Sequence, residues 1–525
     1  MPIVQQGSIN TTALVVPDLY VQIVPPQNLV LNGVPTNIVG VVGTASWGPV
    51  GQPSIIGTMS DYAVAFGPIM PRKYDLGTQV ATAVQQGASN FRCVRVTDGT
   101  DTAAQLGVFY SGTQGPLVLT ALYTGSMGSQ ISVTFSPGSA ANTWAMSVSM
   151  PGLTPEVYDN IAGTGETFYQ NLVSAVNLGN GPLRGPSQII VAALGNSFSE
   201  MPVSGSFPFS YGSPGSDGAT NISAATLVGV DTLPRLGMYA LRGQGCSLGV
   251  LADADDSTEW TNQTEFGLSE GVYVIGVGPA GDNISNAVTV KQVAGVDSYA
   301  FKLMFGDWVW WNDTVNGQTR LVSPQGFVAG RLANLSPEQS PLNKPLYGVI
   351  GTQKSGQPGT SQATSYASAD LQTLFSAGID VIANPQPGGS YWGVRLGHNT
   401  SSNAAVNGDN YTRMTNYIAE TLNSGMGLFV GMVINSTLFQ QIRSTQLQFL
   451  SAMMMQGMLG TTDGSLPYSV ICDTSNNPLS RTSLGYVQCD VQVQYQGINE
   501  KFIINVEGGQ TVQVQHQTLP SGQIQ

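Results

Sequence analysis

The sequence predicts a multidomain α/β and α+β protein with a discontinuous α/β core, an inserted mainly β domain, an α+β C-terminal domain and extended terminal arms. Strand, helix and strand patterns follow one another within residues 37–96, an order typical of α/β units with parallel pairing. Residues 100–215 are rich in Gly, Ser and Thr and contain short alternating segments. Two long amphipathic helix patterns dominate residues 409–459.

Length and composition favour a large assembly. At 525 residues the chain has room for roughly three or four domains of about 150 residues. Charged residues make up 9% of the chain, whereas soluble domains average about 25%. Few repelling charges suit a surface that is covered by neighbouring subunits. A neutral, secreted, β-rich protein is the alternative that composition leaves open.

Charge and hydropathy argue against two classes of partner. The net charge is −13 and no Lys/Arg cluster is present, whereas contacts to nucleic-acid phosphates need clustered cations. The first residues lack the basic start and apolar core of a signal peptide. No run of about 18 apolar residues exists, so we expect no membrane span and no membrane insertion.

The four cysteines are widely scattered: Cys93, Cys246, Cys472 and Cys489. They form no CxxC or Cys/His spacing, so we expect reduced structural thiols and no metal site. Cys472 and Cys489 fall in two predicted strands that would be neighbours. The sequence leaves open whether they pair.

The first hundred residues read as an arm followed by an α/β unit. Residues 1–20 have no helical period, so we expect an extended arm. The apolar run 37–45 predicts a buried strand, and helices are predicted at 58–67 and 75–87 before a strand at 91–96. The α/β alternation resumes after a Gly/Pro/Ser-rich loop at 205–221.

The C-terminal third reads as helix, buried strand, helix and sheet. A helix is predicted at 409–425, with Asp409 as N-cap and Gly425 as its stop. The apolar run 426–435 predicts a buried strand. A second helix, 436–459, begins at the N-cap Ser436. Strands of a terminal sheet are predicted at 466–473 and 486–496. Residues 500–508 are expected to close the domain, and 510–525 form a final alternating arm.

Two short motifs resemble catalytic or cofactor signatures. Residues 276–281 match GxGxxG, and Asp297 lies at the distance of a ribose-binding acid, but it follows a poor strand. Residues 245–249 match GxSxG around Ser247, yet a strand follows instead of a helix. The only histidines available as a base, His398 and His516, lie in a polar loop and a terminal arm. We therefore expect no catalytic centre and no cofactor.

Two further clusters have structural explanations. The acidic cluster lacks the spacing and the central glycine of a calcium loop, and reads as a solvated loop: Asp253, Asp255, Asp256 and Glu259. Three tryptophans have the composition of a sugar platform, but packing between strands explains them better: Trp308, Trp310 and Trp311.

Several segments, in order, resemble contractile tail sheath proteins. Residues 18–67, with Pro17 before them, resemble the start of these proteins. They combine the opening Pro17-Asp18-Leu19-Tyr20-Val21, a small-residue strand, a Gly-Pro connector and a helix that ends in Phe66-Gly67. Residues 324–330 resemble a Pro-x-Gly-x-x-Ala-Gly segment, and residues 392–395 resemble a Trp-Gly-x-Arg segment. The match is specific as a set, although no single motif carries it.

The resemblance implies a structural subunit that forms hexameric rings, stacked in a helical sheath around an inner tail tube, and contracts to drive the tube through the host envelope. The implied partners are other copies, the tube protein, and baseplate and tail terminator proteins. The implied location is a virion tail assembled in host bacterial cytoplasm. The sheath of a phage-derived bacteriocin or a secretion machine, a secreted adhesin and an α/β enzyme remain alternatives.

The resemblance also implies a division of the chain and candidate contact residues. The expected parts are an N-terminal arm, a middle α/β domain, an inserted outer domain, a tube-facing domain and a C-terminal arm: 1–20, 21–99 with 216–365, 100–215, 366–508 and 509–525. The arms would add strands to neighbouring subunits through Val4, Ile9, Leu14, Val16, Val512, Val514 and His516. The candidates for tube contact are Arg395, Arg413 and Arg443.

Overall fold

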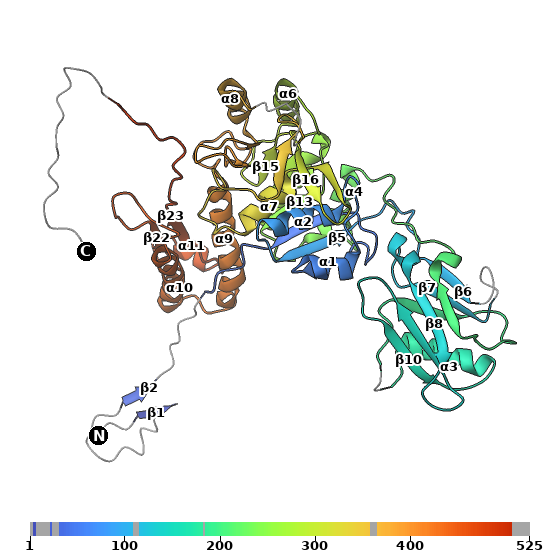
Figure 1. Cartoon of the computed structure of the whole chain (residues 1–525). Coiled ribbons are helices and arrows are strands. Elements are labelled where there is room, and N and C mark those ends of the chain that lie inside the picture. Colours follow the sequence, from blue (N-terminus) through green and yellow to red (C-terminus); the bar gives the residue numbers. More distant parts are fainter. Residues whose placement is uncertain are drawn as a thin grey trace, which may run out of the picture.

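The computed structural model describes residues 4–6, 21–23, 31–108, 115–181, 184–357 and 365–506. Three groups of elements follow one another along an elongated molecule (Figure 1). A sheet covered by helices occupies the centre, the elements between residues 101 and 217 lie at one end, and a pair of long helices lies at the other. The predicted mixed α/β class is confirmed.

The central sheet has seven strands in the order β19-β15-β14-β13-β3-β5-β4. All neighbours are parallel except β4, which is antiparallel to β5. Strands from before and after the 101–217 segment pair directly, because β3 lies beside β13. The strand bounds are β3 Val39–Gly43, β4 Pro53–Ile56, β5 Phe91–Arg95, β13 Leu248–Leu251, β14 Tyr273–Val277, β15 Phe301–Met304 and β19 Ile379–Asp380.

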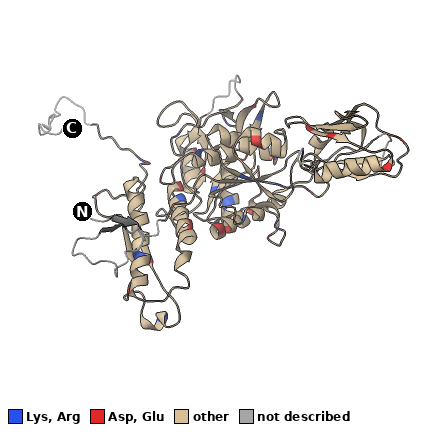
Figure 2. Ribbon diagram, turned by 90° about the horizontal axis from the view of Figure 1, so that it is seen from below, with Lys and Arg blue, Asp and Glu red and all other residues tan. Residues whose placement is uncertain are grey.

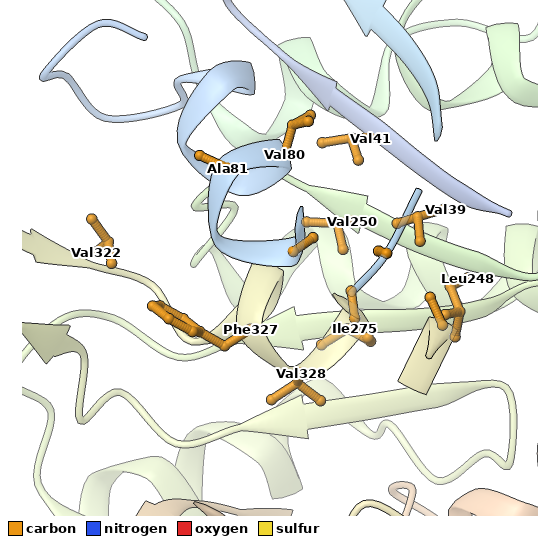
Figure 3. Packing of buried hydrophobic residues seen from close by; sticks show 14 of the residues in the cluster. Val39, Val41, Val80, Ala81, Leu248, Val250, Ile275, Val322, Phe327 and Val328 are labelled. Atoms are coloured by element: carbon orange, nitrogen blue, oxygen red, sulfur yellow. The ribbon is translucent and has the colours of Figure 1, made fainter. Parts of the chain in front are cut away.

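Helices cover both faces of this sheet, and its central strands are therefore apolar throughout. Side chains on one face, such as Val41 and Ile275, pack under α1 Met59–Phe66, α2 Leu76–Gln85 and α7 Gln325–Ala333 (Figure 3). Those on the other face pack under α4 Ala224–Val228, α5 Trp260–Glu270, α6 Ile284–Ala294 and α8 Ser368–Ser376. The predicted strand 37–45 and the helices 58–67 and 75–87 are confirmed.

Close packing of α7 on α2 explains the glycines of the Pro-x-Gly-x-x-Ala-Gly segment. A Cβ atom on Gly330 would lie 2.4 Å from the Ala83 carbonyl oxygen, and one on Gly326 would lie 2.1 Å from Thr82 Oγ1. Any larger residue would therefore push the two helices apart. The motif has a packing role on the covered face of the sheet.

The elements between residues 101 and 217, called the insert below, form a separate hydrophobic core. Two antiparallel sheets, β10-β9-β8-β12 and β11-β7-β6, pack with α3 Glu166–Leu178. The strands are β6 Gln105–Val108, β7 Leu117–Ala121, β8 Ser132–Pro137, β9 Trp144–Ser149, β10 Glu156–Ile161, β11 Ile190–Leu194 and β12 Gly205–Pro208. Trp47 of the central region also packs into this core.

The C-terminal elements form a third core. Helix α9 Asp409–Met426 packs against α10 Ser436–Met455 through Met414, Ile418, Phe449 and Met453. Strands β22 Tyr468–Ile471 and β23 Asp490–Val493 form a two-stranded antiparallel sheet beneath them. Both predicted helices are confirmed, as is the alternation that places Val491 and Val493 on the packed face.

Smaller elements complete the described chain. Strands β1 Val4–Gln6 and β2 Val21–Ile23 pair in parallel. A three-stranded sheet, β17-β16-β18, and a two-stranded sheet, β20-β21, flank the central region. Their bounds, with that of the last helix, are β16 Val309–Asp313, β17 Gln318–Val322, β18 Val349–Thr352, β20 Ile382–Ala383, β21 Gly393–Val394 and α11 Leu479–Thr482.

The prediction of a buried strand at 426–435 is wrong. Helix α9 continues to Met426, past the predicted stop at Gly425, and a 3-10 turn spans Gly427–Phe429. The segment then connects the two helices, so its apolar side chains have no sheet to join. Four of them are exposed instead: Leu428, Val430, Met432 and Val433.

Both predicted N-caps are displaced by one residue. Gly408 is the N-cap of α9, because the Asp409 carboxylate turns into the protein to meet Lys302. Asn435 caps α10, and its Oδ1 accepts a hydrogen bond from the Leu438 amide at 2.8 Å. Residues 500–506, part of the segment expected to close the domain, form neither helix nor strand.

Candidate assembly surfaces

A fully buried ion network joins the central sheet to α9. Lys302 on β15 lies 2.6 Å from Asp380 on β19 and 2.8 Å from Asp409 at the start of α9, and all three side chains are 0% exposed. The hydroxyl group of Tyr273 on β14 donates a hydrogen bond to the Asp409 carboxylate. Burial alone would lower the pKa of Lys302, but the two carboxylates raise it overall. The ammonium is therefore held charged, and α9 is held on the sheet.

The remaining acceptors of this network are also satisfied. Asp380 accepts hydrogen bonds from the amides of Val381, Leu396 and Gly397 at 2.7–2.9 Å. Lys302 also donates to the His398 carbonyl at 3.0 Å. Buried charges persist when they are paired and hydrogen-bonded in this way. The C-terminal helices are thus positioned rigidly relative to the central sheet.

The prediction that Arg413 contacts a partner is wrong. Arg413 is buried, and its guanidinium donates hydrogen bonds to the carbonyls of Leu335 and Ser336 at 2.8 and 3.0 Å. Burial lowers its pKa to about 10. Arg443 is exposed and its Nε donates to the Val470 carbonyl, whereas Arg395 is half-buried. Only Arg395 and Arg443 retain surface for a contact.

A second junction attaches the insert to the central sheet. The buried Arg95 of β5 donates hydrogen bonds to the carbonyls of Gly48 and Thr124 at 2.8 and 2.7 Å, and to that of Asp217 at 3.3 Å. Asp217 also lies 2.5 Å from Arg72. Burial alone would raise the pKa of Asp217, but the Ser126 amide and Arg72 lower it overall. One arginine of the central sheet thus binds carbonyls of the central region and of the insert.

The last described residues form an exposed apolar segment. Residues 500–506 are extended, and the side chains of Phe502, Ile503, Ile504 and Val506 are between 68% and 87% exposed. The C-terminal sheet β22-β23 has only two strands, so each of these strands has one edge without a partner strand in the described chain. Unpaired edges and exposed apolar strands favour pairing with another chain.

A second exposed apolar patch lies at the turn between α9 and α10, which projects from the body of the molecule (Figure 2). The chain carries no charged residue from 421 to 442. Leu31, where the continuous described chain begins, packs beside Gly425 at the base of this turn. The continuous described chain therefore begins at the same end of the molecule as this turn.

The residues of the catalytic-looking motifs serve the fold. Ser247 Oγ donates to the Ile38 carbonyl at 3.0 Å, while His398 Nε2 lies 2.6 Å from Glu500. No hydrogen bond joins Ser247 to His398, and His516 lies outside the described residues. Strand β14 and helix α6 do flank the GxGxxG segment, but a Cβ on Gly276 would lie 2.2 Å from the Phe301 ring. Asp297 instead accepts hydrogen bonds from Ser402.

The acidic cluster is divided among separate structural roles. Asp253 is buried and accepts hydrogen bonds from the Tyr74 amide and Gln79, and Asp255 pairs with Lys73. Asp256 caps a 3-10 turn, and Glu259 accepts a hydrogen bond from Asn262. Within the described ranges, no group of three or more His, Cys, Asp or Glu side chains is arranged to hold a metal ion.

The tryptophans pack between elements. Trp308 and Trp311 are buried, and their ring N–H groups donate to the Gly278 carbonyl and to Gln85. Trp310 is partly buried, and its register partners are Leu321 and Gly351. These three tryptophans therefore do not form an exposed aromatic surface for a sugar.

Most predicted arm residues lie outside the described residues: Ile9, Leu14, Val16, Val512, Val514 and His516. Val4 lies in β1, opposite Val21. The Lys302 network was missed by sequence reasoning. A lysine within the apolar strand Phe301–Met304 was the available signal, since a charge in a buried strand requires a counter-charge.

Solved structures share this architecture. A sheath tail protein from Desulfitobacterium hafniense matches with a TM-score of 0.57 and 15% identity over 86% of this chain and 93% of that chain. A sheath tail protein from Listeria innocua matches with a TM-score of 0.58 and 13% identity, covering 85% and 90%. The chain has the fold of sheath tail proteins.

A solved helical sheath also shares this fold. The helical sheath of the anti-feeding prophage, in its contracted state, matches with a TM-score of 0.52 and 12% identity over 94% of this chain and 99% of that chain. No protein-family model and no curated protein matches the sequence. The predicted resemblance to sheath proteins is confirmed at the level of the fold.

None of the helices in the described part of the chain has the length and hydropathy that a bilayer span requires.

Proposed function

We propose that this chain is the structural subunit of a contractile tail sheath, which polymerises around an inner tail tube and contracts to drive the tube through a host envelope. The shared fold and the sparse surface charge support this proposal. A sheath of a phage-derived bacteriocin or secretion machine is the second candidate, favoured by the match to an anti-feeding prophage sheath.

The observations that carry the proposal are the exposed apolar segment 500–506 and a C-terminal sheet of only two strands. A strand with free N–H and C=O groups adds to a sheet edge, and its side chains then bury against that sheet. We infer that 500–506, with the arm residues that follow it, pairs with β22 or β23 of another copy. The N-terminal arm supplies a second such strand.

The proposed division of the molecule is the one that the resemblance to sheath proteins implies. In it, residues 366–508 face the tube, residues 21–99 and 216–365 form the middle of the wall, and the inserted domain of residues 100–215 lies outside. The buried Lys302 network makes the central sheet and α9 move together. Contraction is then a change in how whole subunits pack, with the paired arms keeping the rings connected.

The proposed partners are other copies of the chain, the tube protein, and baseplate and terminator proteins, within a virion tail assembled in host cytoplasm. Arg395 and Arg443 are the proposed cations for an acidic tube surface. Charge reversal, Arg395→Glu with Arg443→Glu, is expected to weaken assembly on tubes at low salt more than at high salt. Unchanged assembly at both salts would remove this contact from the proposal.

The test of the proposed function is electron microscopy of the purified full chain, with and without tubes of the cognate tube protein. The intact chain is expected to form striated tubular polymers, and the chain truncated after residue 498 is expected to stay dispersed. Truncation removes no residue of the three hydrophobic cores, so circular dichroism should remain unchanged. Dispersed intact chains in the presence of tubes would contradict the sheath function.

A further inference from the structure

Cys472 and Cys489 are opposite each other at the end of the C-terminal sheet. The register pairs Val470 with Val491 and Ile471 with Asp490. Continuing this antiparallel register by one residue brings Cys472 directly opposite Cys489. Residues that face each other in antiparallel strands have Cβ atoms about 4.5–5.5 Å apart. This spacing is close to that of the two Cβ atoms in a disulfide, about 3.5–4.5 Å.

Both thiols also point to the same side of the sheet. Cys472 is 2% exposed and lies in a small apolar cluster with Leu438, Phe439 and Ile442 of α10, and Cys489 packs against this cluster. Cys489 Sγ also donates a hydrogen bond to Gln446 Oε1 of α10 at 2.7 Å. Common orientation and contact are the two conditions that a cross-strand disulfide requires.

The other two cysteines provide a contrast within the same chain. Cys93 lies on β5 and Cys246 precedes β13, and strand β3 runs between β5 and β13. Two strands on either side of a third are about 9–10 Å apart, beyond the Cα separation of a disulfide. Cys93 and Cys246 are therefore buried thiols of similar environment that cannot pair without moving the sheet.

We propose that Cys472 and Cys489 are a redox-sensitive modification site that forms an intrachain disulfide with a low-molecular-weight disulfide as oxidant. The Cys489 thiolate, being the more exposed, attacks the reagent and releases one reagent thiol. The Cys472 thiolate then attacks Cys489 Sγ and releases the second reagent thiol. The two protein thiols are oxidised by two electrons, the reagent is reduced to two thiols, and the two protons pass to the released thiolates.

Burial controls how fast this site reacts. Burial, together with the nearby Cys472, raises the pKa of Cys489 to about 12. The reactive thiolate is therefore scarce at neutral pH, and its fraction rises about tenfold per pH unit below that pKa. The pair stays reduced in a reducing compartment and oxidises slowly after transfer to an oxidising one.

The disulfide would join β22 to β23 and enclose residues 473–488 in a covalent loop. Asn477 already bridges the two ends of this loop, because its side-chain amide donates hydrogen bonds to the Asp473 and Gln488 carbonyls. Oxidation therefore restrains the sheet that receives the added strand in the proposed function. This consequence rests on that function, whereas disulfide formation does not and is measured on the dispersed chain.

The experiment incubates the reduced full chain with oxidised glutathione, blocks remaining thiols under denaturing conditions, and measures intact mass and disulfide-linked peptides. The expected product has lost two of its four thiols, carries a Cys472–Cys489 link, and forms about tenfold faster at pH 8.5 than at pH 7.5. Four free thiols after prolonged incubation, a stable glutathione adduct on Cys489, or a link between chains would overturn the proposal.

Matched variants keep the result interpretable. Cys472→Ser is expected to leave Cys489 with a glutathione adduct that does not resolve, and Cys489→Ser should abolish the link even if Cys472→Ser folds poorly. Cys93→Ala should leave the link and its rate unchanged. Amide hydrogen exchange in 468–471 and 490–493 should slow on oxidation and recover after reduction; faster or equal exchange in the oxidised chain would contradict the restraint.

Discussion

The central sheet and the C-terminal sheet differ in how completely the rest of the chain covers their surfaces. The seven strands of the central sheet are covered by helices on both faces, and its junction with α9 buries a complete ion network. The C-terminal sheet has only two strands, and the chain that follows it carries an exposed apolar segment at 500–506. The first satisfies its own surfaces, whereas the second leaves surfaces that another chain can cover. Stability and assembly are thus carried by different regions.

The strongest test of the self-contained region is removal of its buried ammonium. Lys302→Met leaves Asp380 and Asp409 buried without a counter-charge, and we expect a loss of about 3–5 kcal/mol in the free energy of unfolding. Urea denaturation measures this loss. The control, Lys73→Met, breaks an ion pair whose lysine is 45% exposed, and should cost less than about 1 kcal/mol. Equal losses in the two variants would contradict the role of the network.

A buried acid at the covered face gives a pH-dependent test. Burial raises the pKa of Asp75, the N-cap of α2, from 3.8 to about 7. Between these values the folded chain keeps a proton that the unfolded chain has lost, so the free energy of unfolding falls as pH rises. The loss amounts to up to about 4 kcal/mol between pH 4 and 8.

Asp75→Asn should remove this pH dependence while keeping an oxygen acceptor for the Thr78 amide, which Asp75 now binds at 2.8 Å. Urea unfolding of the natural chain and the variant at pH 5 and pH 8 measures the difference. Parallel stability curves for the two proteins would show that Asp75 does not titrate in this range.

The same substitution in the central sheet and in the exposed segment 500–506 sharpens the comparison further. Ile275→Ala on β14 removes a side chain that is 0% exposed, and should cost about 2–5 kcal/mol. Ile503→Ala removes one that is 79% exposed, and should change the stability of the dispersed chain by less than about 0.5 kcal/mol. A large loss for Ile503→Ala would mean that 500–506 packs on its own chain.

Local patterns were enough to predict much of the fold. The apolar run 37–45 and the helices at 75–87 and 436–459 form as expected, because each segment has the apolar periodicity of the element that it forms. The run 426–435 was mispredicted because an apolar segment of strand length is read as buried. Its exposure reflects the absence of a neighbouring strand, which no local pattern reports.

The candidate surfaces were less accessible to sequence reasoning. Arg413 was proposed for tube contact as one of the few cations in residues 366–508, but its guanidinium donates hydrogen bonds to the Leu335 and Ser336 carbonyls within the protein. Asp409 was read as a cap, although Lys302 lies more than a hundred positions away in sequence and takes its carboxylate. Such pairings depend on the order of strands in the sheet, which one sequence does not determine.

The most direct test of strand addition is amide hydrogen exchange of residues 500–506 in the dispersed chain and in the polymer. We expect rapid exchange in the dispersed chain, where the segment is exposed. In the polymer, exchange should slow by a factor on the order of a hundred or more, because β-pairing protects the backbone amides. Residues of β14 should exchange slowly in both states. Equally rapid exchange of 500–506 in both states would contradict completion of the C-terminal sheet by another chain.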